Sequence, residues 1–273
     1  MKISVLMSIY LNDDLDKFEL ALESILNQTL VPSEIIIVFD GPVKPEIANY
    51  IYDKTNEGNN IICVKLRINS GLGIALNIGL NHCTNEFVAR MDSDDISIES
   101  RLYIQSEYLR RDNDIVLVGS YMYEFDETPN NTSKVRKLPL HQKEIDKFSK
   151  FRNPFNHPTV MFRKSVILNL GSYKNMLFFE DYFLWLKVLK NGFKTENISE
   201  PLLFFRNKNF IKRRRGLTYL HNELIFYKNV YNEKLLPFHF ILLSLFIKIP
   251  LRIFPYTFTK FFYQNILRKN LSI

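Results

Sequence analysis

Apolar and polar positions in the first third of the chain follow two alternating patterns. Short runs rich in Ile and Val are typical of buried β-strands. Between these runs, apolar residues recur every three or four positions, which is the spacing of one helix face. Strands are predicted at 3–10, 34–39, 61–66 and 87–91, and helices at 15–26, 45–56 and 71–80. Nearly all-apolar strands that alternate with helices predict a doubly wound, mainly parallel α/β sheet with helices on both faces.

The pattern beyond residue 91 is less regular. Further strands are predicted at 115–123 and 202–206, and helices at 99–111, 180–191 and 217–231. A polar loop is expected at 126–137. The segment 153–162 places an aromatic residue, two Asn and a His between prolines and leads into a strand. Loops of this kind commonly line functional sites.

Polar side chains stand where three of the predicted strands end. Tyr10, Asp40 and Asp92 each follow an apolar run. In doubly wound sheets, ligands bind beyond the carboxyl ends of the strands, at a switch in strand order. We therefore expect these three side chains to belong to one site.

The acidic stretch Arg90–Ser97 is the strongest candidate for chemistry. If Asp92 and Asp94 continue an extended strand, their side chains point to the same side because side chains alternate with period two. Such a carboxylate pair can share one Mg²⁺ or Mn²⁺ ion that also binds phosphate. The alternative is a solvated acidic turn in which Asp95 or Ser97 caps the following helix.

A second acidic pair, Glu180 and Asp181, stands at the start of a predicted helix after two Phe residues. Acidic residues in a first helical turn interact favourably with the helix dipole, which is a sufficient structural explanation. A carboxylate flanked by aromatic rings is also partly desolvated, so its proton affinity rises and it can serve as a general base. His157, in the loop at 153–162, is more often a packed histidine than a ligand.

The composition is that of a folded globular protein. The chain has 273 residues, of which 46% are hydrophobic and 24% charged, and its net charge is +7. Residues 206–273 contain 13 Lys and Arg but only 2 Asp and Glu, so the rest of the chain is net negative. This asymmetry indicates an anionic partner, for which nucleic acid, a phospholipid surface and a diphosphate are the alternatives.

The segment 235–247 contains no charged residue but is shorter than the ~20 apolar residues that a bilayer crossing needs. Basic and aromatic residues are interleaved after it, which is typical of a segment that lies in a membrane interface. An ordinary pair of C-terminal core helices is the alternative. The same mixture of basic and apolar residues argues against nucleic acid as the partner.

Two further features concern the cellular compartment. Cys63 and Cys83 lack the spacing of a zinc or redox motif and predict free thiols in a reducing compartment. The first ten residues lack the architecture of a signal peptide and predict a first strand instead.

With these motifs in order, the chain resembles the family two glycosyltransferases of GT-A fold from residue 1 to about 215. The motifs are a first strand that ends in Ser-Ile-Tyr, a second that ends in Asp40, the segment 69–77, Arg-Met-Asp-Ser-Asp-Asp, and Glu180-Asp181. The run from Ala75 to Ser97, with Arg101, is most similar to a bacterial subgroup. That subgroup adds a sugar to N-acetylglucosamine diphospho-undecaprenol during O-antigen or capsule assembly.

The resemblance implies which residues contact the UDP-sugar donor. It implies that Tyr10 and Asp40 hold the uridine of a UDP-sugar. The remaining residues implied to contact the nucleotide-sugar are Asn69, Gly71, Asn77, Arg90 and Asp92.

The resemblance also implies the catalytic groups. Asp92 and Asp94 are the metal-binding Asp-x-Asp pair, with Mn²⁺ or Mg²⁺ as cofactor. Asp181 is the catalytic base and Glu180 its neighbour. Many relatives carry Tyr-Arg-Ile-His after the last strand, whereas this chain has Phe205 to Lys208. We therefore expect basic residues and His157 to bind the acceptor or neutralise the diphosphate. The basic candidates are Arg206, Lys208, Arg213, Arg214 and Arg215.

The implied activity is inverting, metal-dependent transfer of a hexose, with UDP-Gal or UDP-Glc as favoured donor, to form a β-linkage, β-1,3 being favoured. We expect a catalytic domain at 1–215 and a membrane-associating helical extension at 216–273. From this extension and the implied acceptor, we expect the protein to attach peripherally to the cytoplasmic face of the bacterial inner membrane. A nucleotidyltransferase and a non-catalytic protein that binds nucleotide-sugars or membranes remain as alternatives.

Overall fold

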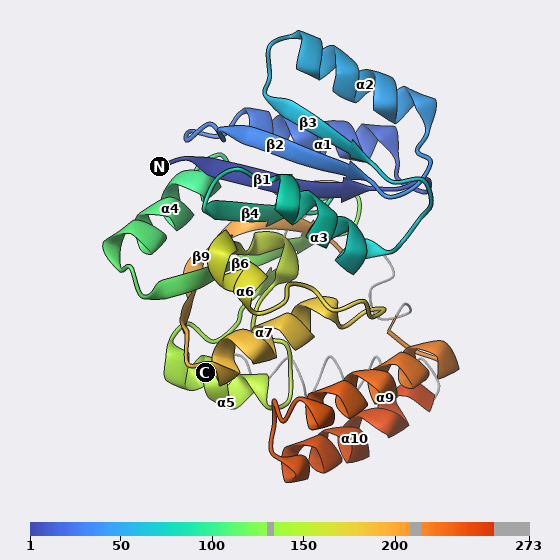
Figure 1. The fold of residues 1–273 in the computed structure, drawn as a ribbon, viewed down its shortest axis with the longest axis vertical. Helices are drawn as coiled ribbons and strands as arrows, with labels where there is room; N and C mark the ends of the chain where they lie inside the picture. The colour runs from blue at the N-terminus through green and yellow to red at the C-terminus, as the bar shows by residue number, and fades with distance from the viewer. Residues whose placement is uncertain (130–133, 208–213, 254–273) are drawn as a thin grey trace.

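In a computed structural model of the protein, residues 1–129, 134–207 and 214–253 are described. The first four strands are parallel and lie in the order β3-β2-β1-β4 (Figure 1). They are β1 (Ile3–Ile9), β2 (Glu34–Phe39), β3 (Ile61–Lys65) and β4 (Phe87–Met91). Helices α1 (Leu15–Leu26), α2 (Pro45–Asn56) and α3 (Leu72–His82) connect them. This half of the molecule confirms the predicted alternation, with boundaries within two residues.

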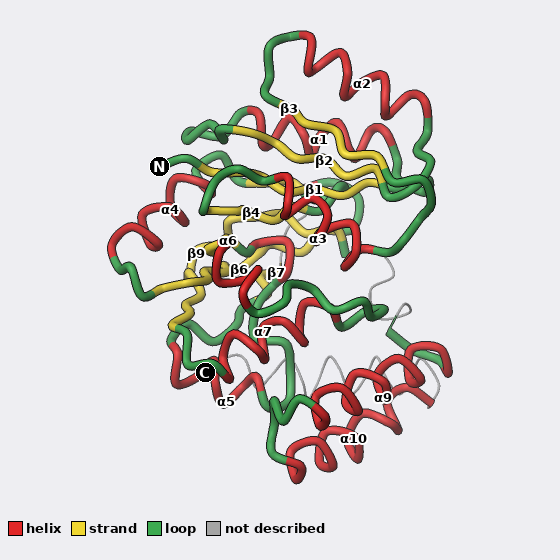
Figure 2. Tube along the Cα trace, viewed as in Figure 1, coloured by secondary structure: helices red, strands yellow, loops and turns green. Residues whose placement is uncertain are grey.

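Helices cover both faces of this sheet (Figure 2). Along β1, Val5 and Met7 pack with α1 and α2 on one face, whereas Leu6 packs with α3 on the other. The alternation follows from the period-two geometry of a strand. Helix α3 lies so close to the sheet that a Cβ on Gly79 would come within 2.4 Å of Cδ1 of Leu6. A glycine is therefore required at this contact.

The sheet continues as a mixed sheet beyond β4, where we predicted mainly parallel pairing. The added strands are β5 (Ile96–Ser97), β6 (Ile115–Phe125), β7 (Lys134–Arg136), β8 (Met161–Arg163) and β9 (Lys194–Arg206). β8 is antiparallel to both β4 and β6, whereas β6 and β9 are parallel. The three-residue β8 follows the segment 153–160 and runs antiparallel to both of its neighbours.

Two predictions in this half need correction. The loop expected at 126–137 contains β7, and the strand expected at 202–206 begins at Lys194. Pro201 lies within β9 at a register shift against β6, where a missing backbone N–H is tolerated. β7 and residues 194–200 of β9 are largely polar, so their pairing with β6, not an apolar run, defines them as strands.

The remaining helices surround the second half of the sheet. They are α4 (Arg101–Arg111), α5 (Gln142–Ser149), α6 (Lys164–Asn169), α7 (Glu180–Lys190), α9 (Leu217–Asn232) and α10 (Phe238–Ile253). Figure 1 shows α9 and α10 side by side below α7. Phe226 of α9 stacks on Phe179 and Tyr182, with ring centroids 5.0 Å apart in each pair. The C-terminal helix pair therefore shares a core with α7.

An ion cluster between α9 and α10 reinforces this packing. The buried carboxylate of Glu223 accepts hydrogen bonds from Nε and Nη2 of Arg252, at 2.8 and 3.0 Å. Nζ of Lys248 lies 3.6 Å from the same carboxylate. Two of the basic residues behind the predicted charge asymmetry are thus paired internally.

Within the described ranges, none of the helices combines the length and apolar character that crossing a bilayer requires. Cys63 and Cys83 are both free thiols, as predicted, and Cys83 is buried.

Candidate active site

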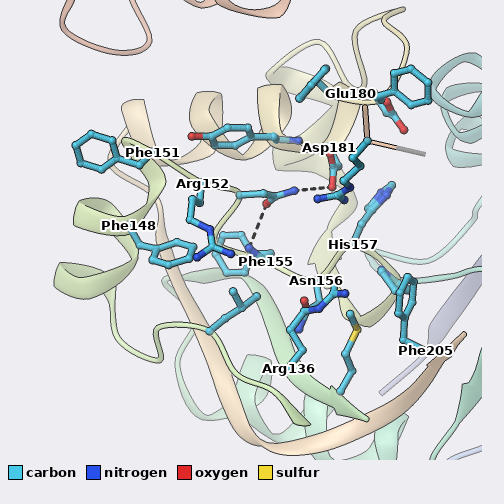
Figure 3. A pocket seen from close by; sticks show the side chains of 18 of the residues that line it. Arg136, Phe148, Phe151, Arg152, Phe155, Asn156, His157, Glu180, Asp181 and Phe205 are labelled. Carbon is cyan, nitrogen blue, oxygen red and sulfur yellow. Dashed lines mark hydrogen bonds between the residues drawn. The ribbon is translucent and has the colours of Figure 1, made fainter. Parts of the chain in front are cut away.

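A cavity of about 840 Å³ lies between the sheet, the start of α7 and α10 (Figure 3). Arg90 and Asp92 at the end of β4, and Glu180 and Asp181 at the start of α7, supply its acidic end. The loop at 153–158 lines it, which confirms the expectation for that segment. Other parts of the wall come from α5 and β7, and from Ser244, Ile247, Lys248, Leu251 and Arg252 of α10.

Asp181 is held on both carboxylate oxygens. Nδ2 of Asn153 donates to Oδ2 at 2.6 Å, and the backbone N–H of Tyr182 donates to Oδ1 at 2.6 Å. Burial raises the pKa of Asp181 above its ordinary value, while the Tyr182 N–H and the positive charge of Arg214 act in the opposite sense. Each carboxylate oxygen has a second lone pair, so the oriented group retains capacity to accept a proton.

Glu180 is only 7% exposed, and within the described residues its Oε2 has no hydrogen-bond partner. Burial, with a smaller contribution from the charge of Asp181, raises its pKa from 4.5 to about 8. Glu180 is therefore a neutral acid near pH 7. An explanation of the pair by the helix dipole requires both carboxyls to be charged, so it does not account for Glu180. The two adjacent carboxyls thus differ in what they can do: Asp181 is oriented by donors, and Glu180 carries a proton.

This difference predicts a pH-dependent stability change for Glu180→Gln. Between about pH 4.5 and 8 the unfolded chain loses the Glu180 proton while the folded protein keeps it, so wild-type stability falls as the pH rises. Gln does not titrate. The free energy of unfolding of Glu180→Gln, measured by denaturant titration, should therefore gain on that of wild type between pH 5 and pH 8, by on the order of a few kcal/mol. A difference that stays constant from pH 5 to 9 would contradict the raised pKa.

Arg90 is a buried cation at the acidic end. It is 2% exposed, and its Nη2 donates to Oδ1 of Asp92. Within the described residues, Nε and Nη1 have no hydrogen-bond partner. Buried guanidinium N–H groups without partners are costly, so this site has donors available for a ligand. Arg101 holds the end of β4 in place, because its Nη2 donates to the backbone O of Arg90 at 2.7 Å.

The acidic stretch after β4 is a turn at Ser93 and Asp94, not an extended strand. The prediction that an extended strand directs Asp92 and Asp94 to the same side is therefore wrong. Asp95 does not cap α4, because it is buried and accepts from the backbone N–H of Arg206 at 2.9 Å. Ser97 lies in β5 and does not cap the helix either. The alternative explanation of the stretch as a helix cap is thus also wrong.

Asp13 joins these carboxylates, which the sequence did not indicate. Its Oδ1 accepts from Oγ of Ser93 at 3.1 Å, and its Oδ2 accepts from the backbone N–H of Tyr10 at 2.8 Å. Burial and the charges of Asp94 and Asp92 raise its pKa to about 6. Asp13 therefore connects the end of β1 to the acidic turn.

The donor set suits a hard divalent cation shared with a ligand. Asp92 and Asp94 offer carboxylate oxygens close enough for both to raise the pKa of Asp13. Among the described residues, no group of three acidic, His or Cys side chains is arranged to hold an ion without other ligands. The residues thus fit a two-carboxylate site completed by ligand oxygens, and they do not fit a closed protein cage.

Asp40 organises the loop before α3. Its Oδ1 and Oδ2 accept from the backbone N–H groups of Ser70 and Gly71, at 2.6 and 3.0 Å. Gly71 precedes α3 with φ +91°, a conformation that favours glycine. Asn69 is exposed on the same loop, and Tyr10 is 42% exposed at the end of β1. These four residues gather at the carboxyl ends of β1 and β2, as expected, but they do not line the large cavity.

Two expected contact residues have structural partners instead. The amide of Asn77 bonds both ways to the backbone of Tyr173, at 2.7 and 2.9 Å, and Asn77 does not line the cavity. His157 lines the cavity, and its Nε2 lies 3.1 Å from the Tyr173 hydroxyl. Burial and the charge of Arg90 hold the pKa of His157 well below 6.5. A neutral His157 provides no charge for a diphosphate.

The basic residues from Arg206 onwards are dispersed. Arg206 is buried and bonds through Nε and Nη1 to the backbone O atoms of Asp94 and Glu127, at 3.1 and 3.0 Å. It positions the acidic turn and does not line the cavity. Arg214 does line the cavity, near enough to lower the pKa of Asp181. Arg215 is not among the lining residues, and Lys208 and Arg213 lie outside the described residues.

A wall of aromatic and basic side chains faces the carboxylates, and the sequence did not indicate it. Figure 3 shows Phe148, Phe151 and Arg152 from α5 and its following loop, with Arg136 and Phe205 below them. Arg136 is bonded to Glu124 through Nε at 2.7 Å. These residues come from segments that are distant along the chain from α7, so no local motif reveals them; only the neighbouring loop at 153–162 was indicated by the sequence.

Comparison with known proteins shows one family. The model of the family described as Glycosyl transferase family 2 matches residues 4–171. A relative from Escherichia coli, "UDP-Gal:alpha-D-GlcNAc-diphosphoundecaprenol beta-1,3-galactosyltransferase", is 36% identical over 271 residues, or 99% of this chain and 98% of the relative. The amylovoran biosynthesis glycosyltransferase AmsE of Erwinia amylovora is 38% identical over 226 residues, 82% of this chain and 84% of its own length.

A solved structure confirms the expected fold. The crystal structure of S. aureus TarS 1-349 in complex with UDP-GlcNAc matches 99% of this chain and 78% of that chain, with a TM-score of 0.66. Its sequence is 17% identical, so the likeness concerns the GT-A fold alone.

Proposed function

The chain belongs to glycosyl transferase family 2, and from this premise we propose that it moves a hexose from a UDP-sugar to N-acetylglucosamine diphospho-undecaprenol. The observation that carries the proposal is the 36% identity to the E. coli galactosyltransferase over nearly the whole of both chains. UDP-Gal is the favoured donor and β-1,3 the favoured linkage for the same reason. The product would enter O-antigen or another surface polysaccharide. Family membership removes the nucleotidyltransferase alternative.

The test is direct transfer. Purified protein and membranes are incubated with a panel of UDP-sugars and a synthetic N-acetylglucosamine diphosphoryl lipid. Transfer of one hexose from UDP-Gal, with a β-1,3 linkage in the product, is the expected result. Binding of UDP-sugar without transfer to any lipid acceptor would support the non-catalytic alternative instead.

Asp181 is the proposed general base. It lines the cavity, both its oxygens are fixed by donors, and its raised pKa strengthens it as a proton acceptor. In the proposed step the acceptor hydroxyl attacks C1 of the donor sugar and gives its proton to Asp181, while the bond from C1 to the UDP oxygen breaks. One displacement inverts the anomeric centre, so an α-linked donor gives a β-linked product.

The leaving diphosphate needs positive charge. Asp92 and Asp94 would hold a Mn²⁺ or Mg²⁺ ion, which stabilises charge developing on the phosphate oxygens. Arg90 supports the same end of the cavity, since its Nε and Nη1 face no partner within the described residues. Glu180, protonated near pH 7, is suited to donate a hydrogen bond to a donor-sugar hydroxyl. Tyr10 and Asp40 are proposed to hold the uridine.

Peripheral attachment to the cytoplasmic face of the inner membrane is proposed for α10. Phe238, Leu242 and Phe246 recur at every fourth position, and all three are more than half exposed. Lys248 and Arg252 of α10 are mostly buried and bind Glu223 of α9. Helix α10 is thus held to α9 by ion pairs and exposes an apolar stripe to solvent. Such a stripe suits a helix that lies at a lipid interface.

Substitution of this stripe should reduce vesicle binding. Phe246 is 80% exposed, so Phe246→Ser removes apolar surface without disturbing the core. The bound fraction on vesicles with anionic phospholipid should fall, with the partition coefficient lower by about 10-fold or more. Val31→Ser, at a 68% exposed position before β2, is the matched control and should bind as wild type. Equal loss in both variants would contradict the assignment to α10.

The division at residue 215 stays a prediction, but the helix pair contributes to the site. Truncation after residue 232 would remove Ile247, Leu251 and Arg252 from the cavity wall. Surface substitutions are therefore the sharper test of membrane binding than the truncated chain.

A further inference from the structure

One aromatic side chain of the cavity precedes the proposed base by three residues. Phe178 and Asp181 both line the cavity. Phe178 is 42% exposed, whereas the adjacent Phe179 is 7% exposed and stacks on Phe226 in the core. Two consecutive aromatic residues therefore have different surroundings. Phe179 stabilises the packing of α7 on α9, and Phe178 keeps apolar surface open at the cavity.

The backbone of Phe178 has an unfavourable conformation. Its φ is +77°, in the left-handed region that a bulky side chain rarely occupies. Of the three non-glycine residues with positive φ in the described part of the chain, Phe178 lines the cavity and Ser172 and Lys234 do not. Such conformations cost free energy and persist where the surrounding structure holds them, often at ligand sites. The chain thus carries an aromatic ring at a position where the backbone alone favours glycine.

The ring of Phe178 is supported by helix α9. It lies against Tyr219, with ring centroids 5.0 Å apart and an angle of 32° between the ring planes. Tyr219 is buried, and the guanidinium carbon of Arg252 lies 4.6 Å from its ring centroid. Arg252 in turn binds the carboxylate of Glu223. Packing within the protein therefore fixes the position of Phe178 before a ligand binds.

The contact with α9 places Phe178 away from the expected uridine contacts. Figure 1 shows α9 and α10 below α7, whereas β1 and β2 lie above it. Tyr10 and Asp40, at the ends of those two strands, do not line the cavity. A general base must touch the acceptor hydroxyl, so the acceptor sugar must adjoin Asp181. Phe178 thus lies where the acceptor is expected, and not where the uridine is expected.

We propose that Phe178 is an aromatic platform on which the acceptor sugar stacks while its hydroxyl meets Asp181. This inference rests on the proposed function and adds a residue that recognises the acceptor. The C–H groups of a sugar ring form an apolar face, which buries apolar surface when it packs on an aromatic ring. A sugar held in this way presents its hydroxyl to the base in a defined orientation, which favours the displacement. Because Tyr219 belongs to α9, the platform is also joined to the helix pair that is proposed to meet the membrane.

The test removes the ring at a position where glycine suits the backbone. Phe178→Gly is compatible with a φ of +77°, so the loop should keep its conformation. The acceptor is N-acetylglucosamine on a diphosphate with a short alkyl chain, and the donor is UDP-Gal. The KM for the acceptor should rise about 10-fold, which is the effect of losing one aromatic contact. The KM for UDP-Gal should stay at the wild-type value.

Lys234→Gly is the matched control for this substitution. Lys234 is exposed, has a φ of +53° and does not line the cavity. The variant makes the same change of residue type at a positive φ, so it reports any effect of backbone freedom alone. Its acceptor KM should equal that of wild type.

Two further variants distinguish a flat platform from a side chain that is merely apolar. Phe178→Tyr keeps the ring and should keep the wild-type acceptor KM. Phe178→Leu keeps apolar volume without a flat face and should raise the acceptor KM nearly as much as Phe178→Gly. A wild-type acceptor KM in Phe178→Gly or in Phe178→Leu would overturn the proposal.

The kinetic constants also separate acceptor binding from other roles of Phe178. A loss confined to kcat would overturn the proposal, because the ring would then only position the carboxyls of α7. An equal rise in the KM for UDP-Gal would overturn it too, since the ring would then serve the donor. If thermal unfolding shows that Phe178→Gly does not fold, the comparison of Phe178→Tyr with Phe178→Leu decides. Absence of transfer by wild type to this acceptor would instead refute the proposed function.

Discussion

Asp181→Asn is expected to lower kcat by about 10²- to 10⁴-fold, the range for loss of a general base, while UDP-sugar binding is retained. An amide cannot take the proton of the acceptor hydroxyl. It also offers only one acceptor atom, whereas Asn153 and the Tyr182 N–H both donate to Asp181. One donor would lose its partner, at a cost of about 1–3 kcal/mol in stability. Thermal unfolding and UDP affinity are therefore measured beside kcat.

Asn153→Ala is the matched control for this prediction. It removes the 2.6 Å hydrogen bond to Oδ2 but leaves the carboxylate and the Tyr182 N–H in place. Its kcat should fall by less than that of Asp181→Asn, because misorientation costs less than loss of the base. If Glu180→Gln abolishes transfer and Asp181→Asn is nearly normal, the roles of the two carboxyls are reversed.

The pH profile of wild type should follow the same group. Burial raises the pKa of Asp181, and a base is active only when deprotonated. The kcat of transfer is therefore expected to fall on acidification at a pH above the ordinary carboxylate range. Asn153→Ala removes a donor that favours the charged form, so the acid limb of its profile should move to higher pH.

The first half of the fold was predictable because its signals are local. The runs that form β1 and β2 are mostly apolar, and the spacing of α1 is regular. The same regularity predicted where Asp40 and Asp92 would lie, at the carboxyl ends of parallel strands. Local pattern failed for β7 and for residues 194–200 of β9, whose largely polar sequences form strands beside β6.

The site was predictable where its residues are contiguous in sequence. Glu180 and Asp181 are adjacent, so their pairing is visible, but their different protonation depends on burial and on Asn153, 28 residues away. Arg206 was expected at a diphosphate because it is basic, yet its contacts with Asp95 and the backbone of Asp94 make it part of the acidic turn. Arg152 and Asp181 line the same cavity although they lie far apart along the chain. No spacing rule relates these residues.

Chelation of divalent cations is expected to abolish transfer, and Mn²⁺ or Mg²⁺ should restore it, with Mn²⁺ the more effective as the family resemblance implies. Asp94→Asn should lose transfer even with added metal, because a neutral amide is a weaker ligand for a hard cation. Asp94 is a cleaner test than Asp92, whose carboxylate pairs with the buried Arg90. Removing that partner would leave a buried charge unpaired and destabilise the fold by about 3–5 kcal/mol.

Binding of UDP gives a readout for the metal that does not depend on turnover. Mn²⁺ should tighten UDP binding to wild type in calorimetric titration, since an ion held by Asp92 and Asp94 would supply positive charge for the diphosphate. In Asp94→Asn this gain should be largely lost, while UDP binding in chelator matches that of wild type. Asp16→Asn, at an exposed position in the first turn of α1, is the control and should keep the full gain. Full transfer activity in excess chelator, or an undiminished Mn²⁺ effect in Asp94→Asn, would remove Asp92 and Asp94 as the metal site and leave Arg90 and Arg214 to balance the leaving group.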